Sequence, residues 1–259
     1  MITLEKAKIV LDRFAGGKLA RGKHNPPNGQ CKVCVEELRC LMQHVTWDGD
    51  EPILGEIAVW DWTDRPEGGT VIEGVCHLLN DSNWSSDDAR TAGCLRLVTL
   101  SEKDETPGWV EKYGKLVIRH IVSGALTDAA AAHFDPRYRE ELQNAAAMCR
   151  TKGTVDACDQ ARIVAVDAAR FVDDCGRQSD LRARNVAYNA AYSAAAISGS
   201  AAASRTAAGH VLVVRRAAAE RDRILRLGVE LLMAAHQGRE PNLWALGLSE
   251  FAYHAKGAA

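Results

Sequence analysis

The chain has 259 residues, of which 47% are hydrophobic and 25% are charged, as in an ordinary globular protein. Its 32 basic and 34 acidic residues leave a formal charge of -2, so nucleic acid is not an expected partner. No apolar run is long enough to cross a bilayer, and residues 1–14 mix charged with apolar side chains, unlike a signal peptide. We therefore expect a cytoplasmic protein, away from membranes, with eight reduced cysteines.

The first half of the chain is predicted to be helical around one small β insertion. Apolar residues at helical spacing predict helices over 3–14, 31–45, 71–79 and 86–100, the last capped by Ser85 or Ser86. Ile, Val and Trp concentrate in residues 53–62, which we predict as a strand. Turn residues follow the strand, so a β-hairpin is expected near residues 53–70.

The second half is predicted to be helical throughout. Helix starts are expected at Thr106-Pro107, at Thr127-Asp128 and at Asp135-Pro136, because each pairs a capping residue or a proline with a first turn. Further helices are expected over 154–174 and 181–236, and residues 194–203 contain six alanines. Small side chains favour tightly stacked helices, either inside a bundle or on a surface for a partner or for self-association.

These elements predict a mainly α protein, a helical bundle with a small β-hairpin insertion near residues 53–70. We expect two domains. Residues 1–125 form a helical domain with the β insertion and a His/Cys/Glu cluster, and residues 126–259 form an alanine-rich helical bundle.

The residues with most chemical potential lie between His24 and Glu37. Cys31 and Cys34 have the Cys-x-x-Cys spacing that places two sulfurs on one metal ion, and His24 could supply a third ligand. Candidates for the fourth ligand are Cys40, Cys76 and His77, none of which belongs to a second Cys-x-x-Cys. Zinc is therefore an alternative to the expectation of no cofactor.

The same residues permit a second hypothesis, in which Cys34 is a nucleophile. A helix N-terminus lowers the pKa of a thiol, and His24 could act as its base. Glu37 lies one turn further on and could orient the histidine or act as a general acid or base. Asp64 or Asp81 could complete a triad. In the simplest interpretation Cys34 packs inside, while His24 and Glu37 form a polar contact that pins the preceding loop.

Other sequence features point away from common enzyme classes. The chain has no phosphate-binding Gly-rich loop with lysine, no Gly-x-Ser-x-Gly and no His-Glu-x-x-His. Cys149, Cys158 and Cys175 lie among Ala, Met and Val, and we predict that all three are buried free thiols. Trp60 and Trp62 would share one strand face, either in the core or as a stacking platform.

Five short segments carry a resemblance to a known family, namely Gly22-Lys23-His24, Cys34-Val35-x-Glu37, Thr63-Asp64-x-Pro66, Leu79-Asn80-Asp81 and Asp87-Asp88-Ala89-Arg90. The chain resembles a family of uncharacterised proteins from actinobacteria and their phages. That family has a Lys-His loop, a helix beginning Cys-x-x-Glu, a cysteine-rich Ser/Thr-Asp-His-Pro segment, a helix ending Asn-Asp and an alanine-rich tail. Arg65 stands where the family has histidine, and Gly68 and Thr70 stand about where it has cysteines.

The resemblance implies a phage or mobile-element protein without implying a particular reaction. We expect a non-enzymatic helical binding or assembly protein, with a protein partner or self-association. The alternative is a Cys- or metal-dependent enzyme that acts on a small polar or nucleotide-like substrate. An enzyme requires His24, Cys34 and Glu37 to converge beside an open pocket, whereas a binding protein requires an exposed surface.

Overall fold

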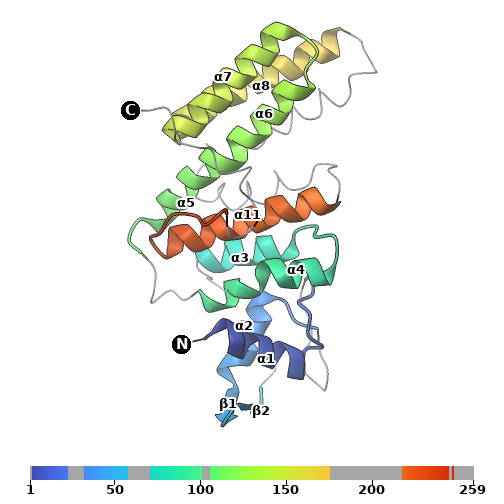
Figure 1. Cartoon of the computed structure of the whole chain (residues 1–259), viewed down its shortest axis with the longest axis vertical. Coiled ribbons are helices and arrows are strands. Elements are labelled where there is room, and N and C mark those ends of the chain that lie inside the picture. Colours follow the sequence, from blue (N-terminus) through green and yellow to red (C-terminus); the bar gives the residue numbers. More distant parts are fainter. Residues whose placement is uncertain are drawn as a thin grey trace. The chain divides into compact units, whose positions relative to one another are not determined.

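The computed structural model describes residues 2–22, 32–57, 71–100, 106–175, 218–244 and 247. Within these ranges the protein is mainly α-helical with one two-stranded antiparallel β-hairpin (Figure 1), which confirms the predicted fold class. None of the described helices is long and apolar enough to span a membrane.

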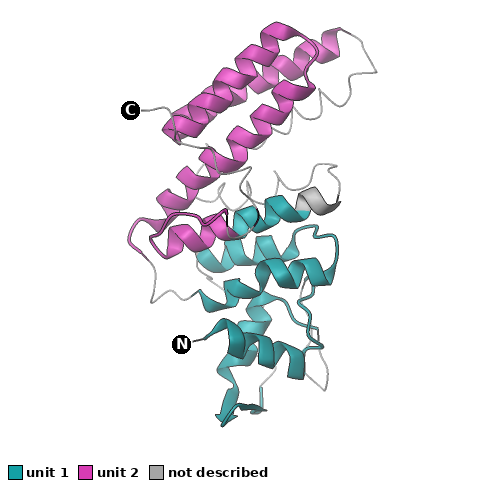
Figure 2. Cartoon of the chain, in the orientation of Figure 1, with its two compact units in different colours: residues 1–105, 216–229 teal, residues 106–215, 230–259 magenta. Residues whose placement is uncertain are grey.

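The chain divides into two compact units (Figure 2). Unit 1 consists of residues 1–105 and 216–229, and unit 2 consists of residues 106–215 and 230–259. The domain boundary predicted from the sequence, after residue 125, lies inside a continuous helical run from 109 to 132. Because that run belongs entirely to unit 2, the division comes before it.

Unit 1 is built from short helices and the hairpin. In chain order its elements are α1 (Leu4–Phe14), α2 (Val35–Gln43), β1 (Val45–Asp48), β2 (Glu51–Leu54), α3 (Val71–Asp81), α4 (Asp87–Cys94) and the 3-10 helix η2 (Leu95–Thr99), followed by the first part of α11 (Ala218–His236). The helix α1 packs against α2, η2 and β2, and α2 packs against α3 and η2. The core lies between these helices.

Local sequence explains where the first helices begin. The side chain of Thr3 accepts a hydrogen bond from the Lys6 N–H and caps α1, and Ser86 caps α4 through the Ala89 N–H. The helix α1 buries Ala7, and with it Val10 and Leu11 one turn later, as its apolar spacing predicts.

The hairpin lies earlier in the chain than expected. Strand β1 pairs with β2 so that Val45 lies opposite Leu54 and Asp48 lies opposite Glu51. Gly49 makes the turn with a φ of 61°, a value that glycine adopts at little cost. Val45 was predicted to end a helix, but α2 ends at Gln43. Residues 58–70, the rest of the predicted hairpin, lie outside the described ranges.

Unit 2 begins with one long helical run. This consists of α5 (Trp109–Val117), a π-helical turn η4 (Ile118–Val122) and α6 (Ser123–Ala132), followed by α7 (Pro136–Lys152) and α8 (Val155–Asp174). The last residues of α11 also belong to this unit. The helices α6, α7 and α8 pack against one another along the chain (Figure 1).

Two of the predicted helix starts in unit 2 are confirmed and two are corrected. Asp135 caps α7 with Pro136 in its first turn, and Thr154 caps α8. Thr127 does not start a helix, since its hydroxyl bonds the Ser123 carbonyl inside α6. Thr106 and Pro107 are part of a turn that the Trp109 N–H closes on the Thr106 carbonyl, and α5 begins at Trp109.

Small side chains form the interface between α7 and α8. The buried residues of α8 are almost all small: Ala157, Cys158, Ala161, Ala165, Ala168, Ala169 and Val172. On α7 they are Leu142, Ala145, Ala146 and Cys149. Small residues allow two helices to approach closely, so this interface has little volume to spare.

Candidate functional site

Cys34 and Glu37 lie together at the start of α2. The Glu37 N–H donates to the Cys34 sulfur over 3.5 Å, and the Cys34 N–H donates to a Glu37 carboxylate oxygen over 2.8 Å. This reciprocal pair is a capping box with a thiol in place of the usual hydroxyl. Both side chains therefore hold the N-terminus of the helix.

The environment of Cys34 keeps its thiol protonated. Cys34 is buried, with 1% of its surface exposed. Burial raises the pKa of the Cys34 thiol well above its ordinary value, and the negative charge of Glu37 raises it further. Because nucleophiles and metal ligands are thiolates, this setting fits a packed capping residue better than a reactive one.

A second group of polar side chains lies at the C-terminal end of α3. The Asn80 amide donates to the Ala20 carbonyl and to the Asp81 carboxylate, both over 2.9 Å. The same carboxylate accepts the Gly22 N–H over 3.0 Å. We call Asn80 and Asp81 the anchor pair, because they hold the chain immediately before Lys23 and His24.

Neighbouring residues fix the anchor pair in place. The Arg90 guanidinium donates to the Asn80 carbonyl over 2.9 Å and also bonds the Asp87 carboxylate. The Trp84 indole donates to the carbonyl of Leu79 over 2.9 Å. Buried donors thus tie the end of α3 to α4 and to the loop before it, and they satisfy the Leu79 and Asn80 carbonyls, which lie too near the helix end to bond within the helix.

The two polar groups hold opposite ends of one segment. The Ala20 N–H donates to the Val33 carbonyl over 2.8 Å, so the chain before residue 23 runs beside the chain after residue 31. The anchor pair holds the first end and the capping box follows the second. Of the other predicted site residues, His24, Cys31 and Asp64 lie outside the described residues, so their meeting with Cys34 stays a prediction.

Within the described ranges, no group of three His, Cys, Asp or Glu side chains is placed to hold a metal ion. Among the candidates for a fourth ligand, Cys40 and Cys76 are buried in the core. Burial raises the pKa of Cys76 to about 12. His77 lies beside Asp81, with 3.3 Å between its Nε2 and a carboxylate oxygen.

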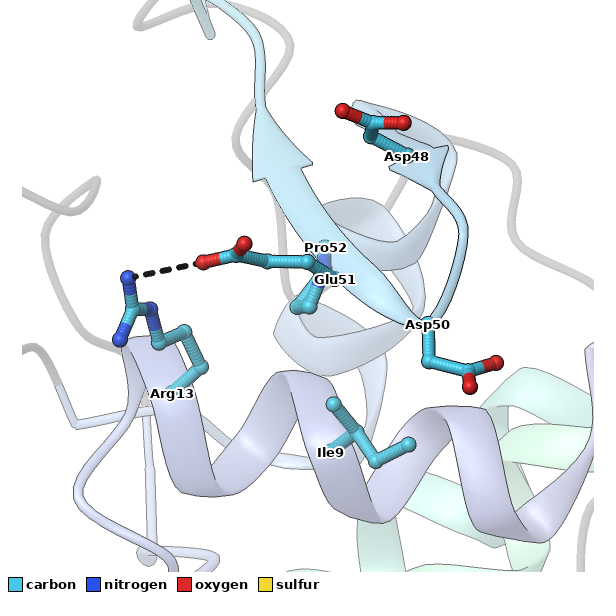
Figure 3. Close-up of a pocket in the computed structure, with 6 residues that line it drawn as sticks. All are labelled: Ile9, Arg13, Asp48, Asp50, Glu51 and Pro52. Atoms are coloured by element: carbon cyan, nitrogen blue, oxygen red, sulfur yellow. Dashed lines mark hydrogen bonds and ion pairs between the residues drawn. The ribbon is translucent and has the colours of Figure 1, made fainter.

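A hollow of about 470 Å³ lies between α1 and the hairpin (Figure 3), lined by Ile9, Arg13, Asp48, Asp50, Glu51 and Pro52. Three of these residues are acidic, but their carboxylates do not converge. Glu51 points toward Arg13, with 3.5 Å between nitrogen and oxygen, while Asp48 and Asp50 point away from each other. The hollow therefore offers no cluster of oxygens for a cation.

Unit 2 carries a surface patch where α7 begins and α8 ends, in which two exposed arginines accompany two half-buried rings. We call it the aromatic–arginine patch: Arg137, Tyr138, Arg170 and Phe171. The Tyr138 and Phe171 ring centroids are 4.9 Å apart. The Arg137 guanidinium carbon lies 4.5 Å from the Tyr138 centroid and 5.7 Å from that of Phe171. The patch lines a hollow of about 440 Å³ whose other lining residues are Glu141, Asp167 and Asp174.

The aromatic–arginine patch was not predicted from the sequence. Nothing in the spacing of Arg137 and Phe171 links them, because they come together only when α7 and α8 pack antiparallel. The pairing of an aromatic residue with arginine in Arg137-Tyr138 is the one local signal that could have drawn attention to it. The prediction that Cys175 is buried was wrong, since this residue is exposed at the end of α8.

No protein-family model matches the chain, and neither does any curated protein or solved structure.

Proposed function

We propose that this chain is a non-enzymatic helical binding or assembly protein that engages a protein partner, a second copy included, through the aromatic–arginine patch. The observation that carries this proposal is the surface patch, with its two exposed arginines beside two half-buried rings. Tyrosine and arginine are among the residues that contribute most binding energy at protein interfaces. The ring of Tyr138 is held by Arg137 and Phe171, so little side-chain entropy remains to be lost on binding.

The charges around the patch favour a protein over a nucleic acid. Two arginines, Arg137 and Arg170, line the hollow together with three acidic residues, Glu141, Asp167 and Asp174. A polyphosphate backbone would meet these carboxylates and be repelled. A protein surface with interspersed charges of both signs can pair with both. The phage or mobile-element character of the chain rests on the family resemblance alone.

A charge reversal and a truncation test the proposal. We expect Arg137→Glu and Phe171→Ala to abolish binding, while Gln143→Ala, an exposed change on α7 outside the patch, leaves it intact. Light scattering from micromolar to submillimolar concentration measures self-association. A wild-type dimer that both patch variants lose identifies a second copy as the partner. If the wild type stays monomeric, a photo-crosslinking residue at position 141, compared with one at 143, tests for another protein.

Two results would overturn the proposal. One is self-association that the patch variants leave unchanged. The other is a monomeric wild type whose crosslinks at position 141 are no more frequent than those at position 143.

A Cys- or metal-dependent enzyme is the second candidate, with His24 and Cys34 acting on a small polar or nucleotide-like substrate. The observation that favours it is the hydrogen bond that the Gly22 N–H, two residues before His24, donates to the Asp81 carboxylate. Metal content of protein purified without a histidine tag tests it. About one zinc per chain that His24→Ala removes would support a metal enzyme, and absence of metal would leave only the thiol mechanism. In that mechanism Cys34→Ser abolishes activity, while the serine hydroxyl replaces the thiol as the helix cap.

A further inference from the structure

Cys149 and Cys158 form a buried dithiol where α7 turns into α8. Cys149 lies in the last turns of α7 and Cys158 in the first turn of α8, and both residues are 0% exposed. The Cys149 sulfur lies 3.5 Å from the Ala157 carbonyl oxygen, immediately before Cys158 in the chain. The two thiols are also close enough for each to shift the pKa of the other. Neither takes part in the aromatic–arginine patch.

The turn between the two helices holds the thiols in register. Gly153 ends α7 in a left-handed conformation with a φ of 62°, and Thr154 caps α8 through the Ala157 N–H. Because the interface around them is built of alanines, the two backbones can approach closely. A disulfide requires Cα atoms about 4.4 to 6.8 Å apart, a separation that helices spaced by small residues can reach.

We propose that Cys149 and Cys158 are a redox pair that closes to a disulfide and staples the α7–α8 hairpin. The oxidant is a small peroxide, which fits a buried site better than a bulky disulfide does. The pair is chemically asymmetric. The interaction with Cys158 lowers the pKa of Cys149, whereas the interaction with Cys149, together with burial, raises the pKa of Cys158. Cys149 is therefore the attacking sulfur.

The reaction balances in two steps. The Cys149 thiol first releases its proton, and the resulting thiolate attacks one oxygen of hydrogen peroxide. The O–O bond breaks, and the departing hydroxide takes up the released proton to become water. This leaves Cys149 as a sulfenic acid. The Cys158 sulfur then attacks the sulfenic sulfur, the S–O bond breaks, and hydroxide leaves with the Cys158 proton as a second water. The two thiols lose two electrons, which the peroxide gains.

Peptide mapping of the full chain tests the proposal directly. After treatment of the native protein with hydrogen peroxide, the remaining thiols are alkylated in denaturant and the chain is cut with trypsin. Cleavage after Arg139, Arg150, Lys152 and Arg162 places the cysteines on peptides 140–150 and 153–162. We expect these two peptides to be linked, with a mass two hydrogens below their sum, and to separate on reduction.

The stability of the oxidised protein provides a second measurement. A closed disulfide should raise the Tm of the transition that includes unit 2 by about 5 to 10 °C, and reduction should reverse the shift. Cys149→Ser and Cys158→Ser should each abolish the shift, and Cys94→Ala, which removes a buried thiol of unit 1, should keep it. Two alkylated thiols at 149 and 158 after peroxide treatment, or linkage of either to another cysteine, would overturn the proposal.

Discussion

The two units of this protein differ in the contacts that stabilise each of them internally. In unit 1, buried polar groups join segments that lie far apart in sequence. The Arg39 guanidinium bonds the Glu36 carboxylate and donates to the carbonyls of Leu97 and Leu100 over 2.9 and 2.7 Å. The Asp222 carboxylate likewise accepts the Ser85 N–H over 2.9 Å. In unit 2, consecutive helices meet through alanine and cysteine side chains.

The contrast predicts different weaknesses. A buried polar contact fails when one partner is removed, because the other partner then loses its hydrogen bonds away from water. An interface built of alanines has few polar groups that a substitution could leave without a hydrogen-bond partner, but it has no room for added atoms. The stability of unit 1 should therefore be sensitive to the removal of a buried polar side chain, and that of unit 2 to the replacement of a buried alanine by a larger residue.

The largest effect is expected from Arg39→Met in unit 1. The change removes the hydrogen bonds that Arg39 donates to the Glu36 carboxylate and to the Leu97 and Leu100 carbonyls, of which the Leu97 carbonyl keeps the Leu100 N–H. The free energy of unfolding should therefore fall by about 3 to 5 kcal/mol. Urea denaturation measures it. Arg13→Met is the matched control, because Arg13 is exposed and its ion pair with Glu51 is a surface contact, so it should cost at most about 1 kcal/mol. Equal costs for the two variants would refute this account of Arg39.

Gly93→Ala tests the packing of α4. An added Cβ would collide with the six-membered ring of Trp84, whose indole is held by the Leu79 carbonyl. The ring cannot turn away without losing that bond, so we expect a loss of about 1 to 3 kcal/mol in thermal or urea unfolding. An unchanged stability would mean that Trp84 has room to move.

Ala165→Leu applies the same test to unit 2. Ala165 is fully buried on α8, and extra methylene groups there must push α7 and α8 apart. The expected loss is about 1 to 3 kcal/mol. Ile163→Ala, on the exposed side of the same helix, should change stability by about 0.5 kcal/mol or less. A tolerated leucine at 165 would show that the alanine interface is loosely packed.

Alkaline pH should weaken unit 1 through its buried thiols. Burial raises the pKa of Cys76 from 9.0 to about 12, and burial also raises the pKa of Cys34 and Cys94. The unfolded chain then loses these protons first, so the stabilisation is complete below pH 9 and declines toward pH 12. Between these pH values, each thiol lowers the free energy of unfolding by up to about 1.4 kcal/mol per pH unit. Cys76→Ala should reduce the slope of stability against pH, and an unchanged slope would contradict the assignment.

The smallest expected effect is an increase in stability, from Gly114→Ala in unit 2. Gly114 lies within α5, and a Cβ added there would have no atom within 4 Å. Gly114→Ala should therefore stabilise unit 2 by about 0.5 to 1 kcal/mol, as alanine replaces glycine inside a helix. A Tm that does not rise would indicate a packing role for the glycine. The opposite outcomes expected at Gly93 and Gly114 separate packing from backbone effects.

Much of the secondary structure could be predicted from the sequence by itself. Periodicity and capping residues located α1, α7 and α8, because these signals are local and lie within a few residues of each helix end. The start predicted at Thr127 was wrong because a threonine inside a helix can bond the carbonyl four residues earlier. β1 was missed because Val45 also continues the helical spacing of α2, and only pairing with Leu54 makes it a strand.

The site depended on tertiary structure. The Cys34–Glu37 spacing is visible in the sequence, but the choice between a nucleophile and a cap depends on burial, which spacing does not carry. The anchor pair bonds residues 59 and 60 positions away, and the aromatic–arginine patch joins the start of one helix to the end of another. The sequence by itself determined the helices, since their signals are local. Only the packing of distant segments decided which polar residues are buried and which side chains share a surface.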